Sequence, residues 1–118
     1  MKGSLLLSTL VVLAGCSTVE PADERPVTRA DITTLIGSAK AQHIDSCKVL
    51  PLGKKACGGP ERYVVYSSES ITDERALLDA VHRYNENAKE AAKRGYSTCQ
   101  HIPEPEPQLV GGMCTIPN

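Results

Sequence analysis

The sequence predicts an α+β fold: a small disulfide-stapled domain with one long amphipathic helix, a possible second helix and short antiparallel strands. Apolar residues recur at helical spacing over residues 73–94, and the segment Tyr-Val-Val-Tyr-Ser at residues 63–67 has the composition of a strand. The chain has no Trp, no Phe and four Tyr, so its core must be thin. A thin core in a chain of 118 residues favours cross-links, which four of the five cysteines can supply.

The N-terminal residues predict export and lipidation. Residues 5–13 are an apolar run that follows Lys2, and the sequence Leu-Ala-Gly-Cys closes the run at Cys16. This run is much shorter than the ~20 residues that a spanning helix needs. The arrangement resembles the signal peptide of bacterial lipoproteins. The resemblance implies that residues 1–15 are removed, that Cys16 carries acyl chains, and that these chains anchor the protein to a membrane without spanning it. An ordinary secretory peptide with an incidental Cys16 is the alternative.

Residues 16–27 are predicted to be the lipidated cysteine and a flexible tether, because they are polar and contain two prolines. Residues 28–118 are then a single small globular domain. The second residue of the predicted mature chain, directly after the lipidated cysteine, is Ser17 and not Asp. By the same resemblance, it implies sorting to the cell outer membrane of a Gram-negative host, with the domain in the periplasm.

The first predicted element of the domain is a helix that begins after Thr28. Thr28 is placed to cap it, and Asp31 lies near the positive end of its dipole. Its apolar face recurs at i, i+3, i+4, i+7 and i+11, namely Ile32, Leu35, Ile36, Ala39 and His43.

Turns and a strand are predicted next. Pro51 with Gly53 indicates one turn, and residues 58–60, Gly-Gly-Pro, indicate another. In the strand over residues 63–67, Tyr63, Val65 and Ser67 share one face, and Val64 and Tyr66 share the other.

The long helix over residues 73–94 has Thr72 as its predicted N-cap and a positively charged last turn before Gly95. Its predicted apolar stripe consists of Leu77, Leu78, Val81, Tyr84, Ala88, Ala91 and Ala92. The alternating prolines of residues 103–107 exclude a helix and favour an extended loop, which residues 99–102 and 108–110 flank as short edge strands.

Two disulfides are expected among the four later cysteines, Cys47, Cys57, Cys99 and Cys114. Three connectivities are open. The preferred one joins Cys47 to Cys57 and Cys99 to Cys114, because each pair brackets a turn-rich segment. A metal site that includes His101 is the competing interpretation, but no Cys-x-x-Cys or His-x-x-x-His spacing supports it. We therefore expect neither a metal nor a cofactor.

The composition argues against nucleic acid as a partner, because 13 basic and 14 acidic residues leave no basic field. No catalytic setting is evident for His43, His82 or His101, and no serine lies in a Gly-x-Ser-x-Gly motif, so an enzyme is not expected. The candidate partner-binding residues are Lys54, Lys55 and Arg62, a local basic cluster. A solvated loop is the alternative interpretation of that cluster.

The segment from Cys57 to Ser67 contains Cys-Gly-Gly-Pro followed by Tyr-x-x-Tyr-Ser. Together with the N-terminal motif and the late cysteines, it resembles a group of small, uncharacterised proteobacterial lipoproteins, a likeness that implies no particular activity. The sequence thus predicts a membrane-anchored envelope lipoprotein with a non-enzymatic binding or structural role at the periplasmic face, its partner an envelope protein or the cell wall. The alternative is a periplasmic inhibitor or immunity-type protein that acts on a hydrolase.

Overall fold

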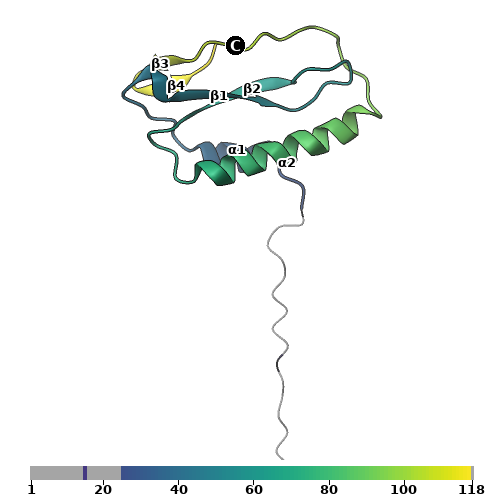
Figure 1. Ribbon diagram of the computed structural model, residues 1–118, viewed down its shortest axis with the longest axis horizontal. Helices are drawn as coiled ribbons and strands as arrows, with labels where there is room; N and C mark the ends of the chain where they lie inside the picture. The colour runs from purple at the N-terminus through teal and green to yellow at the C-terminus, as the bar shows by residue number, and fades with distance from the viewer. Residues whose placement is uncertain (1–14, 16–24, 118) are drawn as a thin grey trace, which may run out of the picture.

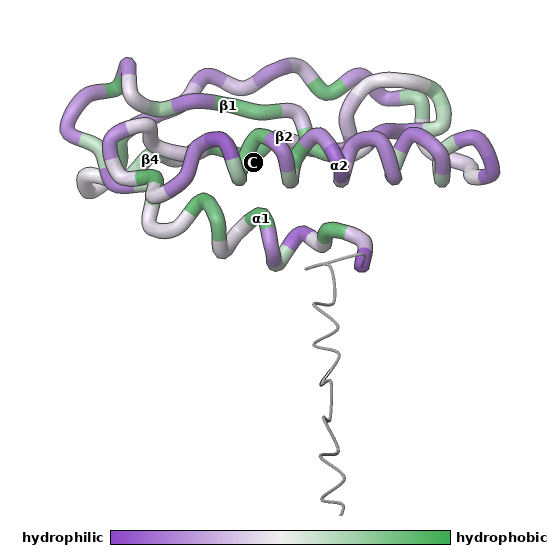
Figure 2. Tube along the Cα trace, turned by 60° about the horizontal axis from the view of Figure 1, so that its bottom comes forward, coloured by the Kyte–Doolittle hydropathy of each residue, from purple (hydrophilic) through white to green (hydrophobic). Residues whose placement is uncertain are grey.

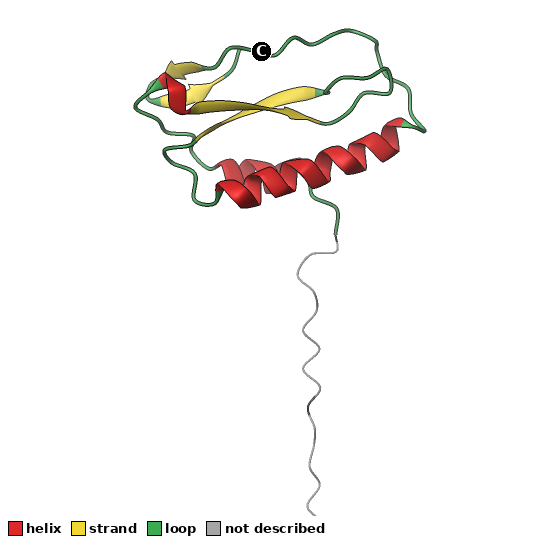
Figure 3. Ribbon diagram, viewed as in Figure 1, coloured by secondary structure: helices red, strands yellow, loops and turns green. Residues whose placement is uncertain are grey.

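The computed structural model describes Gly15 and residues 25–117, so Cys16 and most of the predicted tether lie outside the described residues. The fold is a small α+β domain with two disulfides, as the sequence predicts (Figure 3). Its elements are α1 (Arg29–Ile36), a short 3-10 helix η1 (Ile44–Ser46), β1 (Cys47–Leu52), β2 (Arg62–Ser67), α2 (Glu74–Ala92), β3 (Gln108–Val110) and β4 (Met113–Thr115). None of the helices in this described part combines the length and the apolar character needed to cross a bilayer.

The molecule is built in layers around the β1–β2 hairpin. Strands β1 and β2 pair antiparallel, with Val49 opposite Val65. The two helices cover one face of this hairpin, and an extended segment of residues 99–107, here called the strap, runs along the other face (Figure 1). The strap leads into the smaller β3–β4 hairpin, whose two-residue turn is Gly111-Gly112, both with positive φ.

The alternation of β2 follows the prediction and separates two hydrophobic clusters. Val64 and Tyr66 belong to the cluster on the helix side, whereas Val65 packs in a second cluster against the C-terminal segment. Tyr63 lies on the strap side as well, where its hydroxyl donates to the carbonyl oxygen of Ile102 at 3.4 Å. The period-2 geometry of a strand thus lets one hairpin serve two layers.

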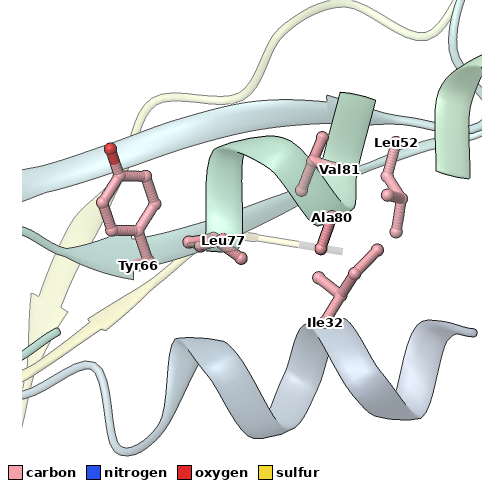
Figure 4. Close-up of a cluster of buried hydrophobic side chains, with 6 residues drawn as sticks. All are labelled: Ile32, Leu52, Tyr66, Leu77, Ala80 and Val81. Carbon is pink, nitrogen blue, oxygen red and sulfur yellow. The ribbon is translucent and has the colours of Figure 1, made fainter. Parts of the chain in front are cut away.

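The helix-side cluster is the principal core. Its buried members point toward one another from α1, the hairpin and α2 (Figure 4). They are Ile32, Leu52, Tyr66, Leu77, Ala80 and Val81. The strap-side cluster is smaller and consists of Ala39, Ala41, Cys47 and Cys114.

Helix α2 confirms the long amphipathic helix with small corrections at its start and in its stripe. The N-cap is Asp73 rather than Thr72, and its carboxylate accepts from the backbone N–H of Ala76 at 3.0 Å. Leu77 is fully buried, but Leu78 is 42% exposed and Ala91 is exposed as well, so the assignment of these two residues to the apolar stripe was wrong. Each residue turns the helix by 100°, which carries Leu78 away from the buried line of Leu77 and Val81. Figure 2 shows hydrophobic and hydrophilic residues alternating along α2, as one buried face requires.

Helix α1 confirms the predicted cap but is shorter than predicted. The Thr28 hydroxyl accepts from the backbone N–H of Asp31, and Asp31 bonds back to the backbone N–H of Thr28. The helix ends at Ile36, because Gly37 and Ala39 both have positive φ. The segment after it pairs instead with the C-terminal chain, where the N–H of Cys114 donates to the carbonyl of Ala39 at 2.8 Å. The predicted helical continuation to His43 was therefore wrong.

Contacts with the domain begin before residue 28. Val27 packs against the core, and the Arg25 guanidinium bonds both carboxylate oxygens of Asp31, at 2.8 and 2.9 Å. These bonds and those from Thr28 hold the pKa of Asp31 well below its usual value.

The disulfides join Cys47 to Cys114 and Cys57 to Cys99, so the preferred pairing was wrong. Cys47 begins β1, whereas Cys57 lies in the loop beyond its far end. The six residues of β1 alone span roughly 20 Å, far more than the ~6 Å that separates the Cα atoms of a disulfide. Each bond instead fastens one end of the C-terminal segment to the hairpin.

Two further expectations fail for local reasons. Pro51 lies inside β1, paired with Tyr63, rather than in a turn. The strand has no hydrogen-bonded neighbour on its other side in the described chain, and such an edge strand tolerates a residue without an N–H. Residues 108–110 form β3 as predicted, but residues 99–102 are not a strand, and β4 takes the place of the partner expected there.

Candidate functional site

The structure divides the predicted basic cluster and adds new members to it. Lys54 and Lys55 line a hollow of about 350 Å³ together with Lys89 of α2 and with Lys93, the C-cap of that helix. Arg62 lines a different hollow, of about 450 Å³, between the hairpin and the strap. We call the first of these, with its four lysines, the lysine hollow.

The loop between β1 and β2 carries Lys54 and Lys55 to α2 because Asn85 holds it there. The N–H of Gly53 donates to Oδ1 of Asn85 at 2.7 Å, and Nδ2 of Asn85 donates to the carbonyl of Pro51 at 3.1 Å. Gly53 has a φ of 83°, and a Cβ at this position would lie 2.6 Å from the Glu61 carboxylate. A larger residue would strain this turn and crowd Glu61.

Lys89 lies in the last turn of α2, and Lys93 is the C-cap with helical backbone angles, so the two side chains, four residues apart, lie on one face. The sequence shows this spacing but predicts a solvated face, because nothing in it reveals that the β1–β2 loop packs beside the end of α2. Cations near a helix C-terminus also interact favourably with the helix dipole. The site is thus completed by Lys89 and Lys93, which lie at least 35 positions after Lys54 in the sequence.

The charges in the lysine hollow are only partly compensated. Nζ of Lys93 lies 2.9 Å from the Glu90 carboxylate, and this hydrogen bond lowers the pKa of Glu90. Nζ of Lys55 donates to the carbonyl of Gln100 in the strap, which leaves its charge uncancelled. Within residues 25–117, neither Lys54 nor Lys89 has a hydrogen-bond or ion-pair partner of its own.

Two further acidic residues, Glu61 and Glu86, lie close to these lysines. An adjoining hollow of about 300 Å³ is lined by Lys54, Lys89, Asn85 and Glu86. Four lysines thus stand against Glu61, Glu86 and the already paired Glu90, which leaves a net positive charge. A positive hollow open to water suits an anionic group of a partner.

We expect Asn85→Ala to detach the β1–β2 loop from α2 and to lower the free energy of unfolding by about 1–3 kcal/mol. The reason is that the buried N–H of Gly53 would lose its acceptor. Asn87→Ala is the matched control, because Asn87 is exposed on the same helix and gains the same helix propensity, and its effect should stay within ~0.5 kcal/mol. Urea denaturation of both variants checks this. Equal midpoints would contradict the role of Asn85.

The second polar cluster of the structure serves the fold. The carboxylate of Glu69 accepts from the backbone N–H groups of Gln42 and His43, at 3.0 and 3.2 Å. Hydrogen bonds from Ser46 and from those N–H groups lower the pKa of Glu69. Nδ1 of His43 lies 3.8 Å from the same carboxylate. Glu69 therefore ties the segment before β1 to the end of β2.

The remaining histidines are dispersed, since His82 is exposed on α2 and His101 is exposed in the strap. Across the described ranges, no three His, Cys, Asp or Glu side chains gather in a way that could hold a metal ion.

Comparisons with protein-family models, with curated proteins and with solved structures found no match to this chain.

Proposed function

We propose that the chain is a lipid-anchored protein of the bacterial cell envelope with a non-enzymatic binding role at the periplasmic face of the outer membrane. The sequence Leu-Ala-Gly-Cys that ends at Cys16, the lipobox of bacterial lipoproteins, supports the anchor. The single observation that carries the binding role is the convergence of Lys54 and Lys55 with Lys89 and Lys93 around one hollow.

The ligand chemistry that fits this hollow is an anionic group, a carboxylate or a phosphate. Cell-wall peptides present carboxylates and membrane lipids present phosphates, so both sources lie within reach of a membrane-anchored domain. Each exposed charge pair contributes only about 0.2–1 kcal/mol, so the hollow would supply orientation and a moderate, salt-sensitive affinity.

The test is co-sedimentation of the mature protein, kept in mild detergent, with purified peptidoglycan before and after amidation of its carboxylates. Phosphate is tested separately with monomeric short-chain phosphatidylglycerol against short-chain phosphatidylcholine. Lys54→Gln combined with Lys89→Gln should weaken binding to the true source by about 2- to 30-fold at low salt. Lys40→Gln combined with Lys48→Gln makes the same change of charge elsewhere and should have little effect. Equal losses in both double variants would show a response to net charge only and contradict the site.

An inhibitor or immunity-type protein remains the second proposal, and it needs the strap to enter the cleft of a hydrolase. The strap lies along the hairpin instead of projecting from it, with Pro105 and Pro107 half-buried. Ile102 is also half-buried, and the other strap residues are exposed. This geometry favours the lysine hollow over the strap as the binding surface.

A further inference from the structure

The two disulfides differ sharply in their exposure. Cys47 and Cys114 are 6% and 5% exposed and belong to the strap-side cluster. Cys57 and Cys99 are both exposed, one in the β1–β2 loop and the other at the start of the strap. A thiol from solution therefore has direct access to the second bond and none to the first.

The exposed bond also lies beside the lysine hollow. Cys57 is itself one of the residues that line the hollow, together with Lys54, Lys55, Lys89 and Lys93. Nearby ammonium groups stabilise a thiolate, and a thiolate of lower pKa is the better leaving group in thiol–disulfide exchange. The same charges attract an incoming thiol that carries negative charge.

We propose that the Cys57–Cys99 disulfide is a site of thiol–disulfide exchange that reacts preferentially with thiols of net negative charge. The incoming thiolate attacks Sγ of Cys99, the bond between the two cysteines breaks, and Cys57 leaves as a thiolate. A second thiol of the reductant then attacks the mixed disulfide. The reductant ends as its own disulfide, and its two protons end on Cys57 and Cys99. The proposal uses the lysines of the proposed binding function, but its readout is covalent, so the two can fail separately.

Reduction at this site has a defined structural consequence. Without the bond, two hydrogen bonds hold the first part of the strap to the hairpin and its loop: Tyr63 to Ile102 and Lys55 to Gln100. Just before the strap, the N–H of Cys57 also donates to Oγ of Ser97. Its far end remains fastened through Cys47 and Cys114. Exchange would thus leave this end of the strap held by hydrogen bonds alone and allow the hollow between Tyr63 and Ile102 to open, while the principal core on the other face of the hairpin stays intact.

The test is reduction of the folded, fully oxidised mature protein, with timed alkylation and peptide mass mapping of each cysteine. Glutathione, a thiol of net negative charge, is compared with neutral 2-mercaptoethanol and cationic cysteamine. Each rate is normalised to that of an uncharged linear disulfide peptide. We expect Cys57 and Cys99 to be labelled at least about tenfold faster than Cys47 and Cys114 with every thiol. The normalised rates at Cys57 and Cys99 should fall from glutathione to 2-mercaptoethanol to cysteamine, and added salt should narrow the spread.

Lys54→Gln combined with Lys89→Gln should lower the ratio of the normalised rate with glutathione to that with cysteamine by about 2- to 10-fold. Lys40→Gln combined with Lys48→Gln should leave this ratio unchanged. Circular dichroism verifies that both double variants are folded, and the thiol series on the unmodified protein stands without them. Equal or faster labelling of Cys47 and Cys114 would overturn the proposal. Normalised rates that are equal for the three thiols, or in the reverse order, would also overturn it.

Discussion

We expect Leu77→Ala to lower the free energy of unfolding by about 2–5 kcal/mol, a large fraction of the stability of a domain of this size. Leu77 of α2 is fully buried in the principal core, together with Ile32 of α1 and with Leu52 and Tyr66 of the hairpin. Removal of the side chain leaves a cavity in the cluster with Ile32, Leu52 and Tyr66, and a close-packed core closes such a cavity only in part. Such a loss would bring a small domain close to unfolding at growth temperature.

Leu78→Ala is the control for this prediction, since Leu78 is the next residue on the same helix and is 42% exposed. The same chemical change there should cost less than about 1 kcal/mol. Urea denaturation of the oxidised proteins measures both, with the slope of the transition checked for each variant. If Leu77→Ala and Leu78→Ala lowered the urea midpoint by the same amount, α2 would not turn towards the core the face that the structure describes.

The second large effect is expected outside the described residues, at the predicted anchor. Cys16→Ser should release the protein from the membrane fraction, because it removes the thiol to which diacylglycerol would attach. Burial of acyl chains contributes ~0.8 kcal/mol per CH₂, and two or more chains anchor a protein stably. Ser17→Ala leaves the lipobox intact and should remain in the membrane fraction.

Fractionation with salt and carbonate washes distinguishes acyl anchoring from charge attraction. The lysine hollow could bind an anionic surface weakly, but salt would remove such binding. Persistence of the Cys16→Ser variant in the washed membranes would contradict anchoring through that residue.

Local rules were sufficient for the elements whose cause lies within a few residues. The capping box of Thr28 and Asp31, the acidic start of α2 and the alternation around Tyr66 were all predictable from spacing alone. The fold class followed because a strong helical period, a strand and an even set of cysteines point to one architecture.

Features that depend on distant parts of the chain were not predictable in this way. The disulfide pairing required knowledge that β1 extends through Pro51, which moves Cys47 far from Cys57. The end of α1 depended on pairing of Ala39 with the chain around Met113. Both features depend on contacts between residues more than 60 positions apart. The extent of β1 also depends on Pro51, which a strand tolerates only at the edge of a sheet.

The candidate site was half predictable for the same reason. Lys54 and Lys55 stood out as neighbours in the sequence, but Lys89 and Lys93 joined them only because Asn85 fixes the loop to α2. In the sequence, the only indication of this contact was the polar side chain of Asn85 next to Tyr84, and it does not show which part of the chain Asn85 bonds. Arg62 lies apart from the lysines because it begins β2, where it lines the hollow between the hairpin and the strap.

The central claim is that Cys16 is the lipidated first residue of the mature protein. Intact-mass spectrometry of the protein extracted from membranes tests it most directly. The account predicts a chain that begins at Cys16 and carries added mass equal to diacylglycerol and one amide-linked acyl chain on that residue. A chain that begins at another residue, or an unmodified Cys16, would contradict it.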